Sequence, residues 1–372
     1  MGRLLSRMTA RGALAQIRHV HPVRPGAARG LVAEVYAQVE RDFGMLAPPL
    51  ALHSPAPPAL AACWLLLRES LLASGAAGRA AKEQVAMEVS AGNACPYCVD
   101  VHGATLRALP RPTGTPGTPG APGRPGVPTA AGVTTEGAAG AELSAEASVT
   151  TAAAAERPDA GTELAAVAMT FHYLNRMVNV FLGDSPLPPE LPKGARGPAL
   201  RLFGALMRPA AARPVPPGAA LGLLPAAPPP GDLAWTARVP RLGHAFGAAA
   251  AAIEAGGERR LPTAVRELVT EQVAAWDGDP PGPGRDWAGQ AAAALPPAQR
   301  PAALLTLLTA LASYQVDRRV VGEFLATTPD GDGEAALIEA TAWAALTAAR
   351  RRSGHSRDRT DANNSRTKGT RT

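Results

Sequence analysis

Apolar residues recur along most of the chain with the spacing of amphipathic helices. Between 30 and 44 they occupy positions 31, 32, 35, 36, 39 and 43, which share one face of a helix. The stretch 59–75 is apolar almost all round, which predicts a helix buried in the middle of a domain. Further helices are expected over 79–93 and 162–182, the second with Thr162 as its N-cap and Gly183 after its end. The pattern predicts an all-α protein built as a helical bundle.

The second half of the chain, from about 232 to 354, is again helical and weakly repeats the first. VREL at 265–268 echoes KEQV at 82–85, and YQVDRRVVGEFL at 314–325 echoes YLNRMVNVFL at 173–182. No cysteine occurs in this half. We therefore predict a duplicated helical domain whose second, degenerate copy serves packing.

Segments of different composition separate and flank these two halves. Residues 1–29 are interpreted as a leader, 191–231 as a Pro-rich linker, and 355–372 as a disordered polar tail. The first domain, 30–190, carries a Pro/Gly/Ala-rich insertion over 108–160, with glycine at every third position from Gly114 to Gly126. About five such triplets in one chain are too few for a collagen triple helix, so a disordered insertion is predicted.

Composition narrows the classes of function and the compartment. The net charge is +6, but the arginines are scattered and no basic stripe with interleaved aromatics occurs, which argues against nucleic-acid binding. No uninterrupted apolar run is long enough to span a membrane, and the basic leader lacks the continuous apolar stretch of a signal peptide. Three cysteines are too few for a disulfide scaffold and fit a reducing cytoplasm.

Two of these cysteines, Cys95 and Cys98, form a C-x-x-C pair that is followed by His102. The three residues fall at i, i+3 and i+7 of one expected helix, so neighbouring turns place two sulfurs and an imidazole on one face. Pro96 suits the first helical position, which makes Cys95 the N-cap, where the helix dipole favours a thiolate. We expect a reactive pair that can close a disulfide, whereas Cys63, among apolar neighbours, is expected to be a core thiol.

The same residues allow other interpretations. Val99 stands where a c-type haem site needs a histidine, which excludes haem. Zinc would take Cys95, Cys98, His102 and Glu83, but no second Cys/His pair is present, which disfavours it. Helical flanks argue against a thioredoxin-type unit, which would lie beside a βαβ pattern. A pair of buried, inert thiols stays open, because reactivity depends on thiolate character and exposure.

Glu83 stands twelve residues before Cys95, and His102 stands four residues after Cys98. This combination resembles the signature of the alkylhydroperoxidase D-like (AhpD-like) proteins of the carboxymuconolactone decarboxylase superfamily. The segment FHYLNRMVNVFL, at 171–182, is similar to the helix that follows in that family. The resemblance covers about 30–190 and implies an AhpD-like helical bundle. His172 in this segment is expected to be a packed, structural residue.

The resemblance also implies roles for individual residues. Cys98 would attack peroxide, Cys95 would resolve the product, and Glu83 and His102 would relay protons. Helix-dipole reasoning instead makes Cys95 the more acidic thiol, so the two arguments disagree; we follow the family because His102, one turn beyond Cys98, can act as its base. Burial beside the sulfurs would raise the pKa of Glu83 and suit it as an acid.

Two neighbouring residues bear on this interpretation. Tyr97 stands between the cysteines, where some members of the family carry a histidine, so no relay step through that position is expected. Glu88 is the competing carboxylate on the helix that carries Glu83, but it lies about 140° further round that helix. We expect Glu88 to be a solvated surface charge.

The function that the resemblance implies is a thiol-dependent peroxidase, which reduces alkyl hydroperoxides or hydrogen peroxide through a dithiol/disulfide cycle. Such an enzyme needs no cofactor or metal, but it needs an external dithiol reductant, of the lipoyl type or thioredoxin-like, and it can be a homo-oligomer. The alternatives are a general disulfide oxidoreductase and a redox-sensing helical scaffold protein. Lactone decarboxylation without redox chemistry is disfavoured by the intact thiol pair.

Overall fold

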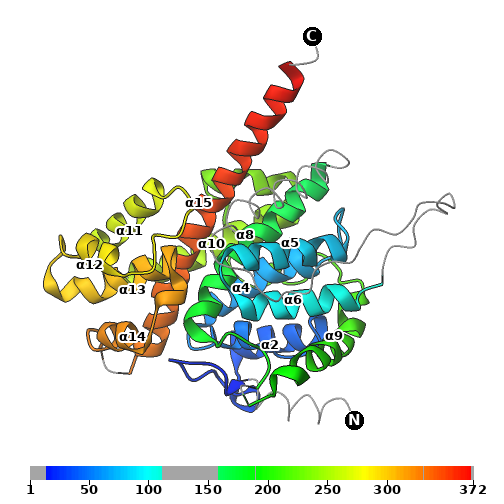
Figure 1. Cartoon of the computed structure of the whole chain (residues 1–372), viewed down its shortest axis with the longest axis horizontal. Helices are drawn as coiled ribbons and strands as arrows, with labels where there is room; N and C mark the ends of the chain where they lie inside the picture. The colour runs from blue at the N-terminus through cyan, green and yellow to red at the C-terminus, as the bar shows by residue number, and fades with distance from the viewer. Residues whose placement is uncertain (1–13, 111–157, 189, 330, 370–372) are drawn as a thin grey trace.

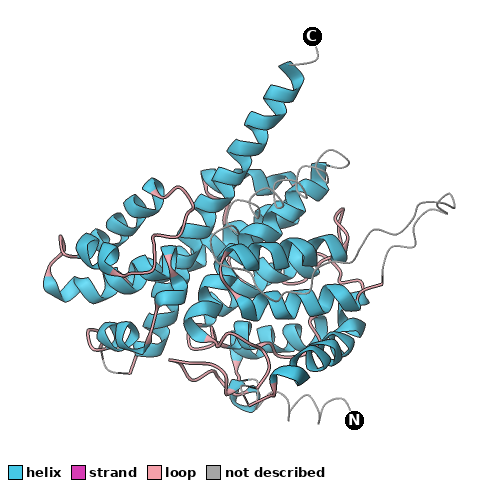
Figure 2. Cartoon of the chain, in the orientation of Figure 1, coloured by secondary structure: helices cyan, strands magenta, loops and turns pink. Residues whose placement is uncertain are grey.

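The computed structural model describes residues 14–110, 158–188, 190–329 and 331–369. These residues form helices joined by loops, with no β-strand among them beyond a single bridge between Ala73 and Val215 (Figure 2). The all-α fold class is therefore confirmed. The predictions for residues 1–13 and 111–157 lie outside the described residues.

The α-helices are α2 (Gly30–Asp42), α3 (Pro48–Ala51), α4 (Pro57–Leu67), α5 (Arg79–Gly92), α6 (Pro96–Ala108), α8 (Pro158–Phe181), α9 (Arg196–Ala212), α10 (Pro240–Arg260), α11 (Thr263–Ala275), α12 (Asp286–Ala292), α13 (Arg300–Leu311), α14 (Arg318–Leu325) and α15 (Gly333–Gly369). A π-helical turn, η2 (Arg68–Leu72), continues α4. Short 3-10 turns are η1 (Pro25–Ala27), η3 (Lys193–Ala195), η4 (Leu221–Leu223), η5 (Gly231–Arg238), η6 (Pro297–Gln299) and η7 (Ser313–Gln315).

The two halves of the chain pack around a shared layer of long helices. In Figure 1, α10, α8 and α15 run through the middle, with α2, α5, α6 and α9 on one side and α11 to α14 on the other. α10 packs against α4, and α15 packs against α8, so each half contributes to the same interior. The all-round apolar sequence of α4 explains its place in this core, because every residue from Ala59 to Leu67 is buried.

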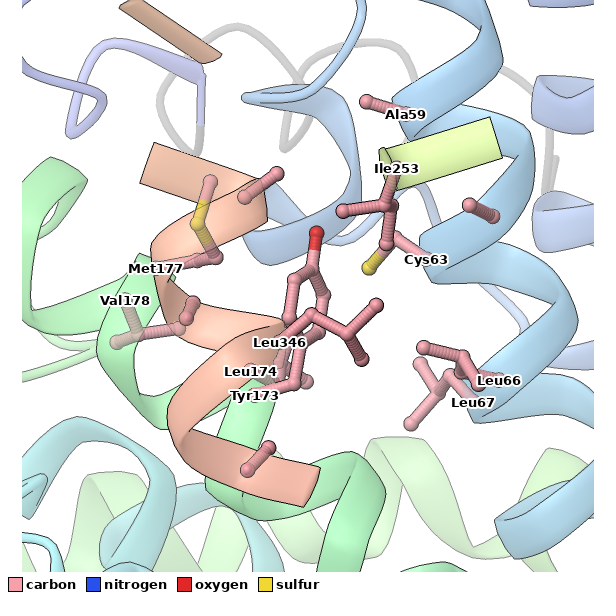
Figure 3. Close-up of a cluster of buried hydrophobic side chains, with 14 of the residues drawn as sticks. Ala59, Cys63, Leu66, Leu67, Tyr173, Leu174, Met177, Val178, Ile253 and Leu346 are labelled. Atoms are coloured by element: carbon pink, nitrogen blue, oxygen red, sulfur yellow. The ribbon is translucent and has the colours of Figure 1, made fainter. Parts of the chain in front are cut away.

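A close view of the core shows how residues far apart in the sequence meet. Cys63 of α4 and Tyr173 of α8 lie among Ile253 of α10 and Leu346 of α15 (Figure 3). Cys63 is buried, and burial raises the pKa of its thiol. It is therefore an inert core thiol, as its apolar neighbours predict.

The segment around the predicted linker packs closely on the first half. α9 lies along α6, and a side-chain carbon added at Gly204 would stand 2.5 Å from the carbonyl oxygen of Ala104. Only a glycine allows the two helices to approach this closely. The division into two domains and the duplication stay predictions, although the halves share one interior.

Two helix boundaries differ from the sequence-based expectation. α8 begins at Pro158, so Thr162 lies inside the helix; a proline in the first turn is compatible with helix geometry and moves the start upstream. α15 is helical through Gly369, where a disordered tail was predicted from 355 onward. Extending a helix already nucleated by its packed first turns costs far less than starting one, which explains the longer helix. Among the described residues, none of the helices combines the length and apolar character needed to cross a bilayer.

Candidate active site

The turn between α5 and α6 places both cysteines at the start of a helix. α5 ends at Gly92 with Asn93 as its C-cap, and Ala94 adopts a left-handed conformation with φ of 50°. Cys95 is the N-cap of α6 and Pro96 its first residue, as the sequence predicts. This geometry puts Cys98 in the first turn of α6, where unpaired backbone N–H groups lie nearby.

The two thiols are reduced, buried and in contact. Cys95 and Cys98 are 1% and 2% exposed, and Cys95 lies close enough to influence the pKa of the Cys98 thiol. The side chains of Ser90 and Asn175, which are hydrogen-bonded to each other at 3.0 Å, also lie near the Cys98 thiol. Burial raises the pKa of the Cys98 thiol well above its usual value, and the neighbouring Cys95 raises it further, while Ser90 and Asn175 act in the opposite direction. A resting Cys98 therefore needs a base that removes its proton.

His102 and Glu83 are brought together as predicted. His102 lies on α6 one turn after Cys98, and its Nδ1 is 2.7 Å from Oε2 of Glu83 on α5. Glu83 is 1% exposed, and its other oxygen accepts a hydrogen bond of 2.7 Å from Nε of Arg79. The ring of Phe171 packs nearly perpendicular to the imidazole, with the two ring centroids 4.6 Å apart, and helps to hold the imidazole in place.

Glu83 is an ionised carboxylate in this setting. Burial would raise its pKa, but the charge of Arg79 and the charge and hydrogen bond of His102 outweigh burial, so the pKa is lowered. The expectation of a raised pKa was therefore wrong, because the sequence argument counted burial and left out Arg79. An ionised Glu83 accepts the Nδ1 proton of His102, which leaves Nε2 as the ring nitrogen able to act as a base.

A pocket opens next to these residues. It holds about 680 Å³ of empty space, including its open mouth, and both Cys98 and His102 line it. Apolar side chains from distant segments form most of its wall, among them Phe43, Met45, Leu50, Val101, Leu174 and Phe203. An apolar cavity with a few convergent polar groups is the usual form of a small-molecule site.

Other residues singled out in the sequence lie as follows. His172 is buried and bonded to Asn93 through its Nδ1, as expected of a structural histidine. Tyr97 lines the pocket, and burial raises its pKa.

Glu88 is half-buried and accepts a hydrogen bond from Gln84, with its Oε2 buried and unpaired, so the prediction of a solvated surface charge was wrong. Its helix face is covered in part by neighbouring side chains, which the angle around α5 alone does not reveal.

Sequence reasoning missed three polar residues of the site. Arg79 stands four residues before Glu83, a spacing at which ion pairs form on a helix, so this contact could have been predicted from the sequence. Ser90 and Asn175 lie on different helices, and no pattern along the chain shows that both meet Cys98. In the part of the chain that the structure describes, no three His, Cys, Asp or Glu side chains gather as metal ligands.

An all-α fold that buries a C-x-x-C pair at a helix start, beside a histidine and a carboxylate, has the arrangement of groups that thiol-redox chemistry requires. No family model matches the chain, and no solved structure matches it. The chain is 36% identical over 344 residues to alkyl hydroperoxide reductase Rv2159c of Mycobacterium tuberculosis, an alignment that covers 90% of this chain and 93% of that protein. This chain therefore belongs to the alkylhydroperoxidase D-like family.

Proposed function

We propose that this protein reduces alkyl hydroperoxides through a dithiol/disulfide cycle of Cys95 and Cys98. The observation that carries the proposal is that Cys98 and His102 line one apolar pocket while His102 is held from behind by a buried Glu83. The pocket wall suits the organic part of an alkyl hydroperoxide, and the thiol and imidazole stand where its oxygens would be bound. The name of the relative, alkyl hydroperoxide reductase, supports the same substrate class.

The cycle has two chemical steps on the protein. Cys98, deprotonated by His102, attacks the terminal oxygen of the hydroperoxide; the O–O bond breaks, a sulfenic acid forms, and the alkoxide takes up a proton to leave as an alcohol. Cys95 then attacks the sulfenic sulfur and releases water, which leaves a Cys95–Cys98 disulfide. One hydroperoxide and two thiols thus give one alcohol, one water and one disulfide.

His102 handles the proton in the first step, and Glu83 acts through it. Nε2 of His102 accepts the thiol proton and returns it to the departing alkoxide, while Glu83 stabilises the imidazolium from the Nδ1 side. Glu83 contacts Arg79 and His102 and does not line the pocket, so we assign it as a positioning residue. Tyr97 is not needed for any step of this cycle.

The disulfide must be reduced by an external dithiol. Both cysteines are almost fully buried, and of the two only Cys98 lines the pocket. A slender dithiol of the lipoyl type can enter such a pocket, whereas the broad surface of a thioredoxin-like protein cannot without a rearrangement. The same burial disfavours a general disulfide oxidoreductase, since a protein disulfide would have to reach Cys98.

Steady-state consumption of cumene hydroperoxide with a dithiol donor tests the proposal. Cys98→Ser is expected to abolish turnover, and Cys95→Ser to allow one rapid reaction per molecule before the sulfenic acid accumulates. Cys63→Ser is the matched control, because Cys63 lies in the core and outside the pocket. Full activity in Cys98→Ser would remove the proposal, as would reduction of disulfides by the wild type without any response to peroxide.

A further inference from the structure

A second pocket lies between the two halves of the chain and shares no lining residue with the first. The end of α5, α8, the loop after α11, η7 and α15 contribute to it, and its polar lining comes from Asn93, Arg176, Trp276, Ser313, Tyr314 and Arg352. On α8, Arg176 follows Leu174 by two residues, a turn of roughly 200° about the helix axis. The two pockets therefore lie on opposite faces of α8.

Arg176 is a buried positive charge without a carboxylate partner. It is 5% exposed, and its Nε and Nη1 donate to the backbone carbonyls of Ala310 and His172. Within the described residues, no carboxylate pairs with it and no hydrogen-bond acceptor meets its Nη2. Burial, and then the charge of Arg352, lower the pKa of Arg176 to about 9, so the guanidinium remains charged at neutral pH.

A second guanidinium reinforces this positive charge. Both Arg176 and Arg352 stand over the ring of Trp276, with their central carbons 5.7 Å and 5.5 Å from its centroid. Burying the guanidinium of Arg176 without a carboxylate beside it carries a desolvation cost that a bound anion would offset. No aspartate or glutamate of the described chain lines this pocket.

We propose that this second pocket binds a small oxyanion, a carboxylate or a phosphate group, between Arg176 and Arg352. The planar fork of a guanidinium matches the paired oxygens of these groups, and the side chains of Asn93, Ser313 and Tyr314 add polar contacts around them. The inference does not depend on the peroxidase chemistry.

The site lies close to the thiol pair. The amide of Asn93 lines the pocket and donates a hydrogen bond of 2.9 Å to Oδ1 of Asn175. Asn175 in turn lies near the Cys98 thiol. A bound oxyanion would thus lie one side chain away from Asn175, a neighbour of Cys98.

Binding is tested by calorimetry and thermal denaturation of the full chain with inorganic phosphate and, separately, with acetate, at ionic strength matched with sodium chloride. We expect saturable binding of at least one of these anions; which one binds distinguishes a phosphate site from a carboxylate site. Arg352→Gln should weaken that binding about tenfold or more. Arg351→Gln is the matched control, because Arg351 is exposed on the same helix, carries the same charge and does not line the pocket.

A second variant keeps the test independent of any folding defect in Arg352→Gln. Tyr314 is 47% exposed at the pocket, so Tyr314→Glu should fold normally and place a negative charge where the oxyanion approaches. It should also weaken binding strongly. Absence of saturable binding by either anion would overturn the proposal, and so would unchanged affinity in Arg352→Gln and Tyr314→Glu.

Discussion

The replacement Glu83→Gln tests the proposed proton relay at the buried carboxylate that contacts His102. The substitution keeps the size of the side chain and its ability to accept a hydrogen bond from Nδ1 of His102, but it removes the negative charge. Arg79, the other partner of Glu83, has a side chain that is 17% exposed and can turn towards solvent. The variant is therefore expected to fold, with its main defect at His102.

The expected loss follows from the change in hydrogen-bond character. A hydrogen bond to a charged group contributes about 1.5–3 kcal/mol and a neutral one about 0.5–1.5 kcal/mol, so neutralising Glu83 removes roughly 1–1.5 kcal/mol of support for the imidazolium. Since about 1.4 kcal/mol corresponds to a tenfold change in rate, kcat/KM for an alkyl hydroperoxide should fall about five- to twelvefold. A ceiling of roughly 10²–10⁴-fold is set by what an entire general acid–base group supplies.

Steady-state kinetics with cumene hydroperoxide measure this effect. The loss should fall on kcat, with KM little changed, because Glu83 does not line the pocket. Glu88→Gln is the matched control: it makes the same chemical change on the same helix, at a carboxylate that contacts Gln84 instead of His102. A kcat/KM for Glu83→Gln within twofold of the wild type would refute the relay, and an equal loss in Glu88→Gln would show that the effect is not specific to the site.

Three further predictions concern pH and packing. Burial lowers the pKa of His53 from its ordinary 6.5 to about 4, so between these two pH values the unfolded chain binds a proton at His53 and the folded chain does not. The free energy of unfolding is therefore highest above pH 6.5 and falls by about 3 kcal/mol in total as the pH is lowered towards 4. Urea unfolding at several pH values should show this loss, and His53→Gln should reduce it; an unchanged pH dependence would contradict the assignment. Because Cys95 raises the pKa of Cys98, Cys95→Ala should move the pH profile of Cys98 alkylation by iodoacetamide to lower pH, and a shift to higher pH would count against the coupling. Gly204→Ala should destabilise the fold by about 1–3 kcal/mol through overpacking against Ala104. Gly197→Ala in the same helix should be neutral or stabilising, because the added carbon there meets only the end of a side chain 3.6 Å away. Equal effects of the two substitutions would refute the close approach of α6 and α9.

The sequence predicted the local geometry of the site better than its environment. The spacing of Cys95, Cys98 and His102 and the proline after Cys95 depend on one local helix, and local geometry follows directly from helical periodicity. The partner carboxylate, Glu83, came from the family resemblance, and the structure places it against His102. These parts were predictable because they lie within twenty residues of one another.

The rest depends on contacts between distant segments. The pocket wall combines Phe43 from the end of α2, Leu174 from α8 and Phe203 from α9, which no periodicity connects. The sign of the pKa shift of Glu83 required the position of Arg79 as well as burial. The same limit applies to the second pocket, whose two arginines meet only because α8 and α15 pack side by side.

The most direct test of the central claim is a single turnover of the reduced protein with one equivalent of cumene hydroperoxide and no reductant. We predict that one equivalent of cumyl alcohol forms and that mass spectrometry of the digested protein finds one disulfide, joining Cys95 to Cys98, with Cys63 still a free thiol. Formation of the alcohol while Cys95 and Cys98 remain titratable as thiols would contradict the dithiol cycle.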